Sequence, residues 1–388
     1  MSSNEKSQKL IITIAYYLAF VTLGLAVGAT GPVLPVLAQH TQAALDGISL
    51  IFVTHALGYM AGTGIGGRGY DRFRGHWLLA GGLLLASGML FLVPTLSNLW
   101  LLAAVMAALG FFQGSVDVGA NTLILWLHGA QVGPLMNGLH FSFGFGAFVA
   151  PLVVAQIGSL SGEIYWVYWL FALLNLPIAW WIWTLPSPPV RAQSAPVDAP
   201  KVRASPLILT LLVAFFFLYV GVEVGYGNWI YTYAVTLKLA DATWAAYLSS
   251  TFWGAYTLFR LAAVWISTKA SPQQILLADF AGAAVGLGLV WLLPASPVAL
   301  WCGTIILGGS VASVFPTMLT LMEQRLHLTG SVTSWCFVGG GVGHMVLPWL
   351  IGQAFEPLGA TSMMVFLLID LVLNVLILAL LLGKSQRA

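Results

Sequence analysis

Residues 10–38, LIITIAYYLAFVTLGLAVGATGPVLPVLA, contain no charged side chain and set the pattern for the whole chain. A helix rises about 1.5 Å per residue, so this stretch exceeds the ~20 residues needed to cross a hydrocarbon layer. It is also too long, and too poor in period-2 alternation, for a strand of a membrane barrel. Similar stretches recur along the chain, and the predicted spans are 10–38, 45–67, 76–95, 98–127, 133–157, 164–184, 207–235, 243–267, 274–293, 297–322, 329–354 and 360–382. We therefore predict an all-α membrane protein with twelve transmembrane helices.

The composition agrees with a surface that lies mostly in lipid. Only 7% of the 388 residues are charged and 59% are hydrophobic, a balance that a soluble domain with a polar surface could not carry. Cys302 and Cys336 both fall inside spans, which argues against a disulfide framework or a metal site. A net charge of +2 does not indicate the strongly basic surface that binds nucleic acid.

The basic residues are confined to alternate connections between the spans. One side carries only Lys238, and Arg260 lies within a span. The other side holds Lys6, Lys9, Arg68, Arg72, Arg74, Arg191, Lys201, Arg203, Lys269, Arg325, Lys384 and Arg387. By the positive-inside rule we expect a multi-pass protein of the cell (inner) membrane with both termini in the cytoplasm. We expect Arg260 to pair with Asp279 or to reach toward the cytoplasmic face.

One long connection divides the chain into two halves of six spans. Residues 185–206 contain six prolines among small and charged residues, a composition that forms an extended tether rather than a core. The predicted organisation is an N-terminal six-helix bundle at 1–184, a cytoplasmic linker at 185–206 and a C-terminal six-helix bundle at 207–388.

The two halves repeat one another. At an offset of 197 residues, Gly24, Val27, Gly28, Gly144, Gly146, Pro151 and Gln156 recur as Gly221, Val224, Gly225, Gly341, Gly343, Pro348 and Gln353. At an offset of 195, Gly114, Ser115, Val116 and Thr122 recur as Gly309, Ser310, Val311 and Thr317. Two parallel six-helix repeats joined by a cytoplasmic linker resemble the major facilitator architecture.

The connection 67–76, GRGYDRFRGH, resembles the signature loop of that superfamily. The resemblance implies that Asp71 and Arg72 belong to a charge relay that latches the two halves. The glycine after this Asp-Arg pair comes one position late, and a solvated basic loop that serves orientation alone is the alternative.

Three stretches resemble the branch that contains the fucose:proton symporter and the sodium-dependent glucose transporter-like proteins. They are 219–235, YVGVEVGYGNWIYTYAV; 117–121, DVGAN; and 137–144, NGLHFSFG. The resemblance implies a sugar carrier and an acid on the first span. Residues 10–38 contain no acid, and the repeat counterpart of Glu223 is Ala26, so substrate recognition must differ from that of the fucose carrier.

Gln113, Asp117 and Asn121 are four residues apart and form one polar stripe on an otherwise apolar helix. A charged side chain at this depth costs at least ~2.5–3.5 kcal/mol on insertion scales, so we expect Asp117 to face a wet cavity or a partner. We predict that Asp117 couples transport to a proton and that Gln113 and Asn121 bind substrate. The alternative for Asp117 is a hydrogen bond to a neighbouring helix.

Asn137 and His140 form a second polar stripe, on the span that follows. His140 lies at a depth similar to that of Asp117, so the two side chains could meet. We predict that His140 takes part in coupling and that Asn137 binds substrate; a buried, hydrogen-bonded histidine is the alternative.

Glu223, Asn228 and Trp229 combine carboxylate, amide and aromatic groups, which suit the hydroxyls and the apolar face of a sugar. The alternative for Glu223 is a bond to the backbone of a helix broken at Gly225 and Gly227. We include His344 as a cavity residue because its helix is expected to line the cavity. Asp370 lies in the middle of the last span without an evident role.

No nucleophile elbow, metal-ligand spacing or phosphate loop is present in the sequence, so we predict no enzyme and no cofactor. The predicted function is a monomeric secondary transporter for a small hydroxylated solute, a monosaccharide, by proton-coupled symport with alternating access. Glycine-rich faces such as 58–67 and 339–343 would allow close approach at a moving interface. A proton is the expected coupling ion, since sodium needs more oxygen ligands than one carboxylate and two amides. A proton-coupled antiporter for drugs or lipids and a uniporter are the alternatives.

Overall fold

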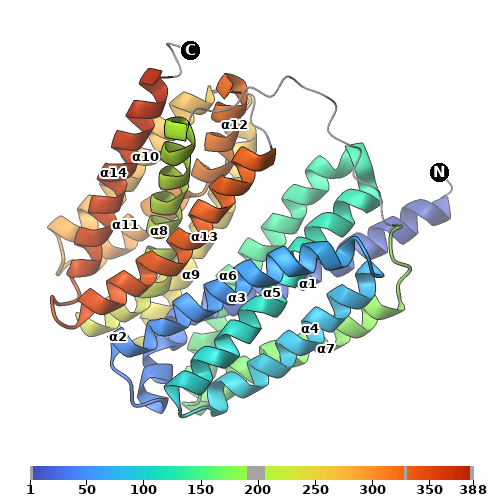
Figure 1. Ribbon diagram of the computed structural model, residues 1–388. Coiled ribbons are helices and arrows are strands. Elements are labelled where there is room, and N and C mark those ends of the chain that lie inside the picture. Colours follow the sequence, from blue (N-terminus) through green and yellow to red (C-terminus); the bar gives the residue numbers. More distant parts are fainter. Residues whose placement is uncertain (1–2, 190–205, 327–329, 385–388) are drawn as a thin grey trace. The chain divides into compact units, whose positions relative to one another are not determined.

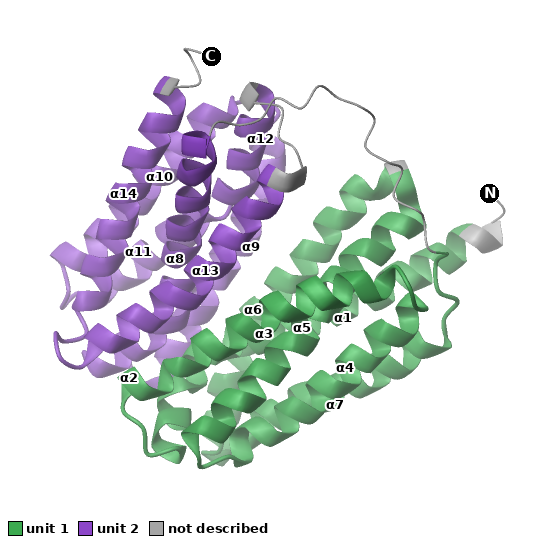
Figure 2. Ribbon diagram, viewed as in Figure 1, with its two compact units in different colours: residues 1–193 green, residues 194–388 purple. Residues whose placement is uncertain are grey.

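The computed structural model describes residues 3–189, 206–326 and 330–384, and all regular structure in these ranges is helical (Figure 1). Residues 1–193 and 194–388 form two compact units, called unit 1 and unit 2 here (Figure 2). Residues 190–205, which make up most of the predicted linker, lie outside the described part of the chain.

Unit 1 contains the six predicted N-terminal spans. Its helices are α1 Ser3–His40, α2 Leu45–Ile48, α3 Leu50–Tyr70, α4 Gly75–Leu92, α5 Leu99–His128, α6 Val132–Ser161 and α7 Tyr165–Thr184, with 3-10 turns η1 Val93–Thr95 and η2 Gly129–Gln131. Asn98 starts α5 by accepting hydrogen bonds from the backbone N–H groups of Trp100 and Leu101, which have no partner within the first helical turn.

Unit 2 contains the other six spans. Its helices are α8 Pro206–Thr236, α9 Ala242–Ile266, α10 Pro272–Leu292, α11 Pro297–Val311, α12 Val314–Leu326, α13 Gly330–Phe355 and α14 Ser362–Lys384. The predicted span 297–322 is interrupted, because α11 ends at Val311 and α12 begins at Val314. We call Ala312 and Ser313 the helix break.

Eleven of the described helical segments are long and apolar enough to cross a membrane. The exception among the predicted spans is α9, which has 25 residues but carries Ser249, Ser250, Thr251 and Arg260. Large apolar side chains point outward elsewhere: Trp100, Leu160 and Trp180 are 74%, 85% and 71% exposed. Such side chains are expected on a surface solvated by lipid rather than water.

The same helix pairs form in both units. In unit 1, α1 packs against α6, α3 against α5, and α4 against both α5 and α7. In unit 2, the repeat-related pairs are α8 with α13, α9 with α11, and α10 with both α11 and α14. The internal repeat detected in the sequence is therefore also a repeat of helix packing.

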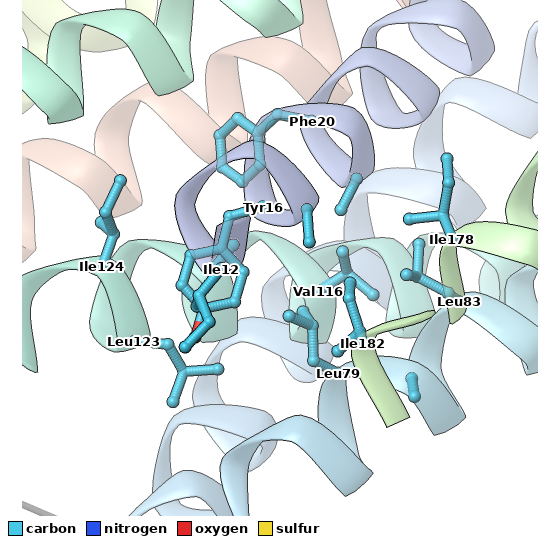
Figure 3. Close-up of a cluster of buried hydrophobic side chains, with 14 of the residues drawn as sticks. Ile12, Tyr16, Phe20, Leu79, Leu83, Val116, Leu123, Ile124, Ile178 and Ile182 are labelled. Carbon is cyan, nitrogen blue, oxygen red and sulfur yellow. The ribbon is translucent and has the colours of Figure 1, made fainter. Parts of the chain in front are cut away.

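An apolar core fills unit 1 where α1, α4, α5 and α7 meet. Side chains such as Tyr16, Leu79, Val116 and Ile182 are less than 1% exposed (Figure 3). At the edge of this core the buried His76 contacts the hydroxyl of Tyr16 at 2.7 Å through Nε2. The core fixes α5 relative to α1, and so helps to position the polar face of α5.

Glycines bring neighbouring helices of one unit into backbone contact. A Cβ atom at Gly62 on α3 would lie 1.9 Å from the Phe111 carbonyl oxygen on α5, and one at Gly343 on α13 would lie 2.1 Å from that of Phe217 on α8. Only glycine allows this approach. The expectation that these faces serve a moving interface is wrong for Gly62 and Gly343, because each packs against a helix of its own unit.

Candidate functional site

Asp117 is half-buried on α5 at the contact with α3. Its Oδ2 accepts a hydrogen bond from the Tyr59 hydroxyl at 2.6 Å, and its Oδ1 accepts one from Asn121 Nδ2 at 3.0 Å. Both carboxyl oxygens therefore face donors, which is the arrangement that satisfies an ionised carboxylate.

Gln113 continues the polar row one helical turn before Asp117. It is only 3% exposed, and its Oε1 lies 2.8 Å from Nε2 of His55 on α3. The predicted stripe of Gln113, Asp117 and Asn121 is thus one row, and it contacts a second row on α3 formed by His55 and Tyr59. We call these five residues the Asp117 cluster.

His140 and Asn137 do not join this cluster. Both side chains are exposed on α6, and the His140 ring meets the Phe20 ring edge to face, with centroids 6.0 Å apart. The expected meeting of His140 with Asp117 is therefore not found, since Tyr59 and Asn121 bond the carboxylate. The reason is the packing of the helices: α6 packs chiefly against α1, whereas α5 packs against α3.

Glu223 is half-buried on α8, and its contacts define the second cluster. Its Oε2 is hydrogen-bonded to the hydroxyl of Tyr219, one turn earlier on the same helix. The carboxyl group also interacts with the Tyr256 hydroxyl and the Arg260 guanidinium on α9. Arg260 Nη1 donates to the Tyr256 hydroxyl at 2.8 Å. We call Tyr219, Glu223, Tyr256 and Arg260 the Glu223 cluster.

The alternative of a helix broken near Glu223 is wrong, because α8 runs without interruption from Pro206 to Thr236. Gly225 and Gly227 instead make room for neighbouring side chains: a Cβ at Gly227 would lie 2.9 Å from the Trp253 ring. The break occurs in the tenth span, between α11 and α12, and the Val311 carbonyl there lies 2.8 Å from the Tyr219 hydroxyl.

Arg260 does not pair with Asp279 as expected. Asp279 on α10 accepts a hydrogen bond from the Ser313 hydroxyl at 2.6 Å. Arg260 bonds to Tyr256 and also lies over its ring, 5.1 Å from the centroid. A residue expected to pair with Asp279 or to reach toward the cytoplasmic face is therefore part of the Glu223 cluster.

Trp229 has no exposed surface in this conformation. Its indole N–H donates to the Pro348 carbonyl at 2.9 Å, and its ring stacks on Phe355 at a centroid distance of 5.0 Å. The expected direct contact with substrate does not fit this geometry, and Trp229 instead joins α8 to α13. Asn228 is buried at 4% exposure and His344 is half-buried on α13.

Asp370 is buried on α14, one turn before the fully buried Asn374. The side-chain amide of Asn374 has no hydrogen-bond partner among the described residues. These two residues form a polar patch inside unit 2 for which the structure gives no role.

The predicted latch residues Asp71 and Arg72 are exposed just after α3. The loop is closed by backbone bonds from Arg72 and Phe73 to the Gly69 carbonyl. At its far end His76 is buried, and its Nδ1 lies 2.9 Å from the Leu185 carbonyl. The loop is thus fixed to the end of α7, and a latch between the units stays a prediction.

Sequence reasoning missed Tyr59 and Tyr256 as partners of the two acids. The signal was available in the internal repeat, since Tyr256 follows Tyr59 by 197 residues, the offset that relates the two halves. At the same offset Arg260 corresponds to Thr63. Each tyrosine contacts the one acid of its cluster, although the acids themselves are not related by the repeat.

The profile of the Major Facilitator Superfamily matches residues 16–348. The chain belongs to this superfamily. The sodium-dependent glucose transporter 1A of Mus musculus is 31% identical over 372 residues, which cover 87% of this chain and 88% of that protein. This relative and the superfamily are transporters, so the prediction that the chain is not an enzyme is confirmed, as is the expected membership of the superfamily.

Solved structures of transporters share the fold. The nucleoside transporter NupG has a TM-score of 0.74 at 15% identity, over 97% of this chain and 98% of that chain. A D-xylose-proton symporter has a TM-score of 0.74 at 14% identity, over 95% of this chain and 97% of that chain. The prediction of an all-helical, multi-pass membrane protein with the major facilitator fold is confirmed.

Proposed function

We propose that this protein is a secondary active transporter that moves a monosaccharide by proton-coupled symport with alternating access. The observation that carries the proposal is the Asp117 carboxylate, held within a membrane-spanning helix by Tyr59 and Asn121. A carboxylate at such a position is costly and typically belongs to an ion or substrate pathway. The substrate class rests on the glucose transporter relative and on the sugar symporter of similar fold.

Proton binding would change the hydrogen bonds of the Asp117 cluster. An ionised carboxylate only accepts, and both oxygens of Asp117 already accept from Tyr59 and Asn121. When Oδ1 takes up a proton, Asn121 Nδ2, which can only donate, loses its acceptor. When Oδ2 takes up the proton, the Tyr59 hydroxyl can accept from it, and the hydrogen of that hydroxyl is freed. Asn121 or Tyr59 is then free to bond to a sugar hydroxyl. This exchange links proton binding to substrate binding in one cluster.

The substrate-binding roles of Gln113 and Asn121 fit this scheme, because their amides can both donate to and accept from hydroxyl groups. Asn137 on α6, Glu223 and Asn228 on α8, and His344 on α13 stay candidates for substrate contact. Trp229 is better assigned to packing, since it is fully buried.

Sodium coupling is the second candidate, favoured by the name of the mouse relative. Sodium requires several oxygen ligands, and Asp117 offers one carboxylate beside Tyr59 and Asn121, whereas a proton needs a single carboxylate oxygen. This difference supports the proton.

The test is counterflow and uphill uptake in proteoliposomes with a panel of monosaccharides. We expect accumulation of at least one sugar when a pH gradient is imposed, without sodium. Accumulation that needs a sodium gradient would overturn proton coupling, and transport of no sugar in the panel would overturn the substrate class.

We also propose that both termini are cytoplasmic, as the twelve-to-one distribution of basic residues indicates. In a chain without Cys302 and Cys336, single cysteines at His40 and Ala195 should be labelled from outside and from inside, respectively. Labelling from the opposite side at either position would overturn the orientation.

A further inference from the structure

The hydroxyl of Tyr219 has more acceptors around it than it can serve. It is hydrogen-bonded to Oε2 of Glu223 and lies 2.8 Å from the carbonyl oxygen of Val311. A phenol has one proton to donate, and a carbonyl oxygen can only accept. If Glu223 is ionised, both neighbours are acceptors, and one of the two contacts has no hydrogen.

A proton on Glu223 removes this conflict. The carboxylic acid then donates to the Tyr219 hydroxyl, and Tyr219 donates to the Val311 carbonyl. The carboxyl group still accepts from Tyr256, whose own hydroxyl oxygen accepts from Arg260 Nη1 at 2.8 Å. Each of the two tyrosine hydroxyls then donates to one acceptor and accepts from one donor.

We propose that Glu223 is a proton-binding site in unit 2, and that Tyr219 transmits its protonation state to the helix break in the tenth span. The step adds one proton from solvent to a carboxylate oxygen, and no bond between heavy atoms changes. When the proton leaves, Tyr219 turns its hydrogen to the carboxylate and releases the Val311 carbonyl.

The helix break can respond when the hydrogen bond from Tyr219 is made or lost. Val311 is the last residue of α11, where carbonyl groups lack the N–H donors of a following turn. Tyr219 supplies one such donor from α8, and Asp279 on α10 holds the neighbouring Ser313 at 2.6 Å. Loss of the Tyr219 bond leaves the break held from one side.

The groups that interact with Glu223 are Tyr219 on its own helix and Tyr256 and Arg260 on α9. The helices α12, α13 and α14 also pack against α8. The ionisable side chains described on these helices are Glu323, Cys336, His344 and Asp370. Arg260 keeps its charge at all relevant pH values, so Glu223 is the group of the cluster that changes protonation.

The first test is infrared spectroscopy of the purified protein, titrated from neutral to alkaline pH. We expect the carboxylic acid band of the wild type to contain a component that disappears on titration and is absent in Glu223→Gln. The same component should persist in Asp370→Asn and Asp279→Asn. These two variants distinguish the Glu223 signal from the signals of other acids of unit 2. An acid band in folded Glu223→Gln equal to that of the wild type would overturn the proposal.

The second test is hydrogen exchange of the segment 305–318, corrected for the intrinsic effect of pH. In the wild type, alkaline pH should increase exchange at the break by about fivefold, the change expected from one net hydrogen bond. Glu223→Gln, whose amide can donate to Tyr219 permanently, should stay protected, and Tyr219→Phe should exchange fast at every pH.

The matched control is the repeat-related segment 110–123 in the unbroken helix α5. Exchange at 305–318 that is independent of pH, or that changes equally in Glu223→Gln and the wild type, would overturn the proposal. Neither readout involves transport, so the result is independent of the coupling role proposed for Asp117.

Discussion

The Asp117 and Glu223 clusters place a carboxyl group beside a tyrosine at the same position of the internal repeat, Tyr59 in one unit and Tyr256 in the other. The acids come from different helices, however. Asp117 belongs to α5, the fourth span, whereas Glu223 belongs to α8, the seventh. The tyrosines have therefore kept their positions while the acids occupy positions that the repeat does not relate.

The hydrogen bonds around the two acids also differ. Asp117 faces two donors, Tyr59 and Asn121, which suit a charged carboxylate. Glu223 shares the Tyr219 hydroxyl with a backbone carbonyl, which suits a neutral acid. The comparison teaches that a duplicated helix framework can surround two acids with different sets of hydrogen-bond partners.

The largest expected effect is the loss of coupling when Asp117 can no longer bind a proton. Asp117→Asn should abolish uphill accumulation, because the amide keeps the polarity of the stripe but cannot exchange a proton. Exchange of sugar at equal concentrations should survive. Uptake and counterflow in the same proteoliposomes provide the measurement. Accumulation driven by a pH gradient in this variant would remove Asp117 from the coupling role.

A second effect concerns the repeat-related pair of Thr63 and Arg260. Arg260→Gln removes the charged donor of Tyr256 and should lower the free energy of unfolding by about 1.5–3 kcal/mol. Thr63→Ala removes only hydroxyl contacts to backbone carbonyls and should cost about 0.5–1 kcal/mol. Denaturation of both variants in detergent would measure the difference. Equal losses of unfolding free energy would mean that Arg260 and Thr63 stabilise their clusters to the same extent.

The smallest effect is the most specific for the comparison. Glu223→Gln imitates a protonated acid and should change the free energy of unfolding by less than about 0.5 kcal/mol. Asp117→Asn removes charge-assisted bonds from Tyr59 and Asn121 and should cost about 1–2 kcal/mol. Thermal melting of the two variants at neutral pH is sufficient. A larger loss for Glu223→Gln would reverse the assignment of the two protonation states.

The spans, the repeat and the polar row of α5 could be predicted from the sequence, because they depend on the length of apolar stretches, on a constant offset along the chain and on spacing within one helix. Sequence reasoning did not predict the partners of the acids, which lie on other helices and are brought together only by packing. Tyr256 and Arg260 reach Glu223 because α9 packs against α8. Trp229 shows the same limit: its amphipathic ring suits a sugar, but the Pro348 carbonyl on α13 occupies its N–H.

The polar character of α9 has a consequence for how the protein is made. A segment enters the bilayer from the translocon when its own apolarity favours it, and an arginine costs up to about 2.5–3.5 kcal/mol near the helix centre. Among the predicted spans, α9 is the one that does not meet the apolarity expected of a span, and it carries the Tyr256–Arg260 pair. We expect α9 to insert together with α8 or α10 rather than alone. Biogenesis of unit 2 would then depend on the same contact between α8 and α9 that surrounds Glu223.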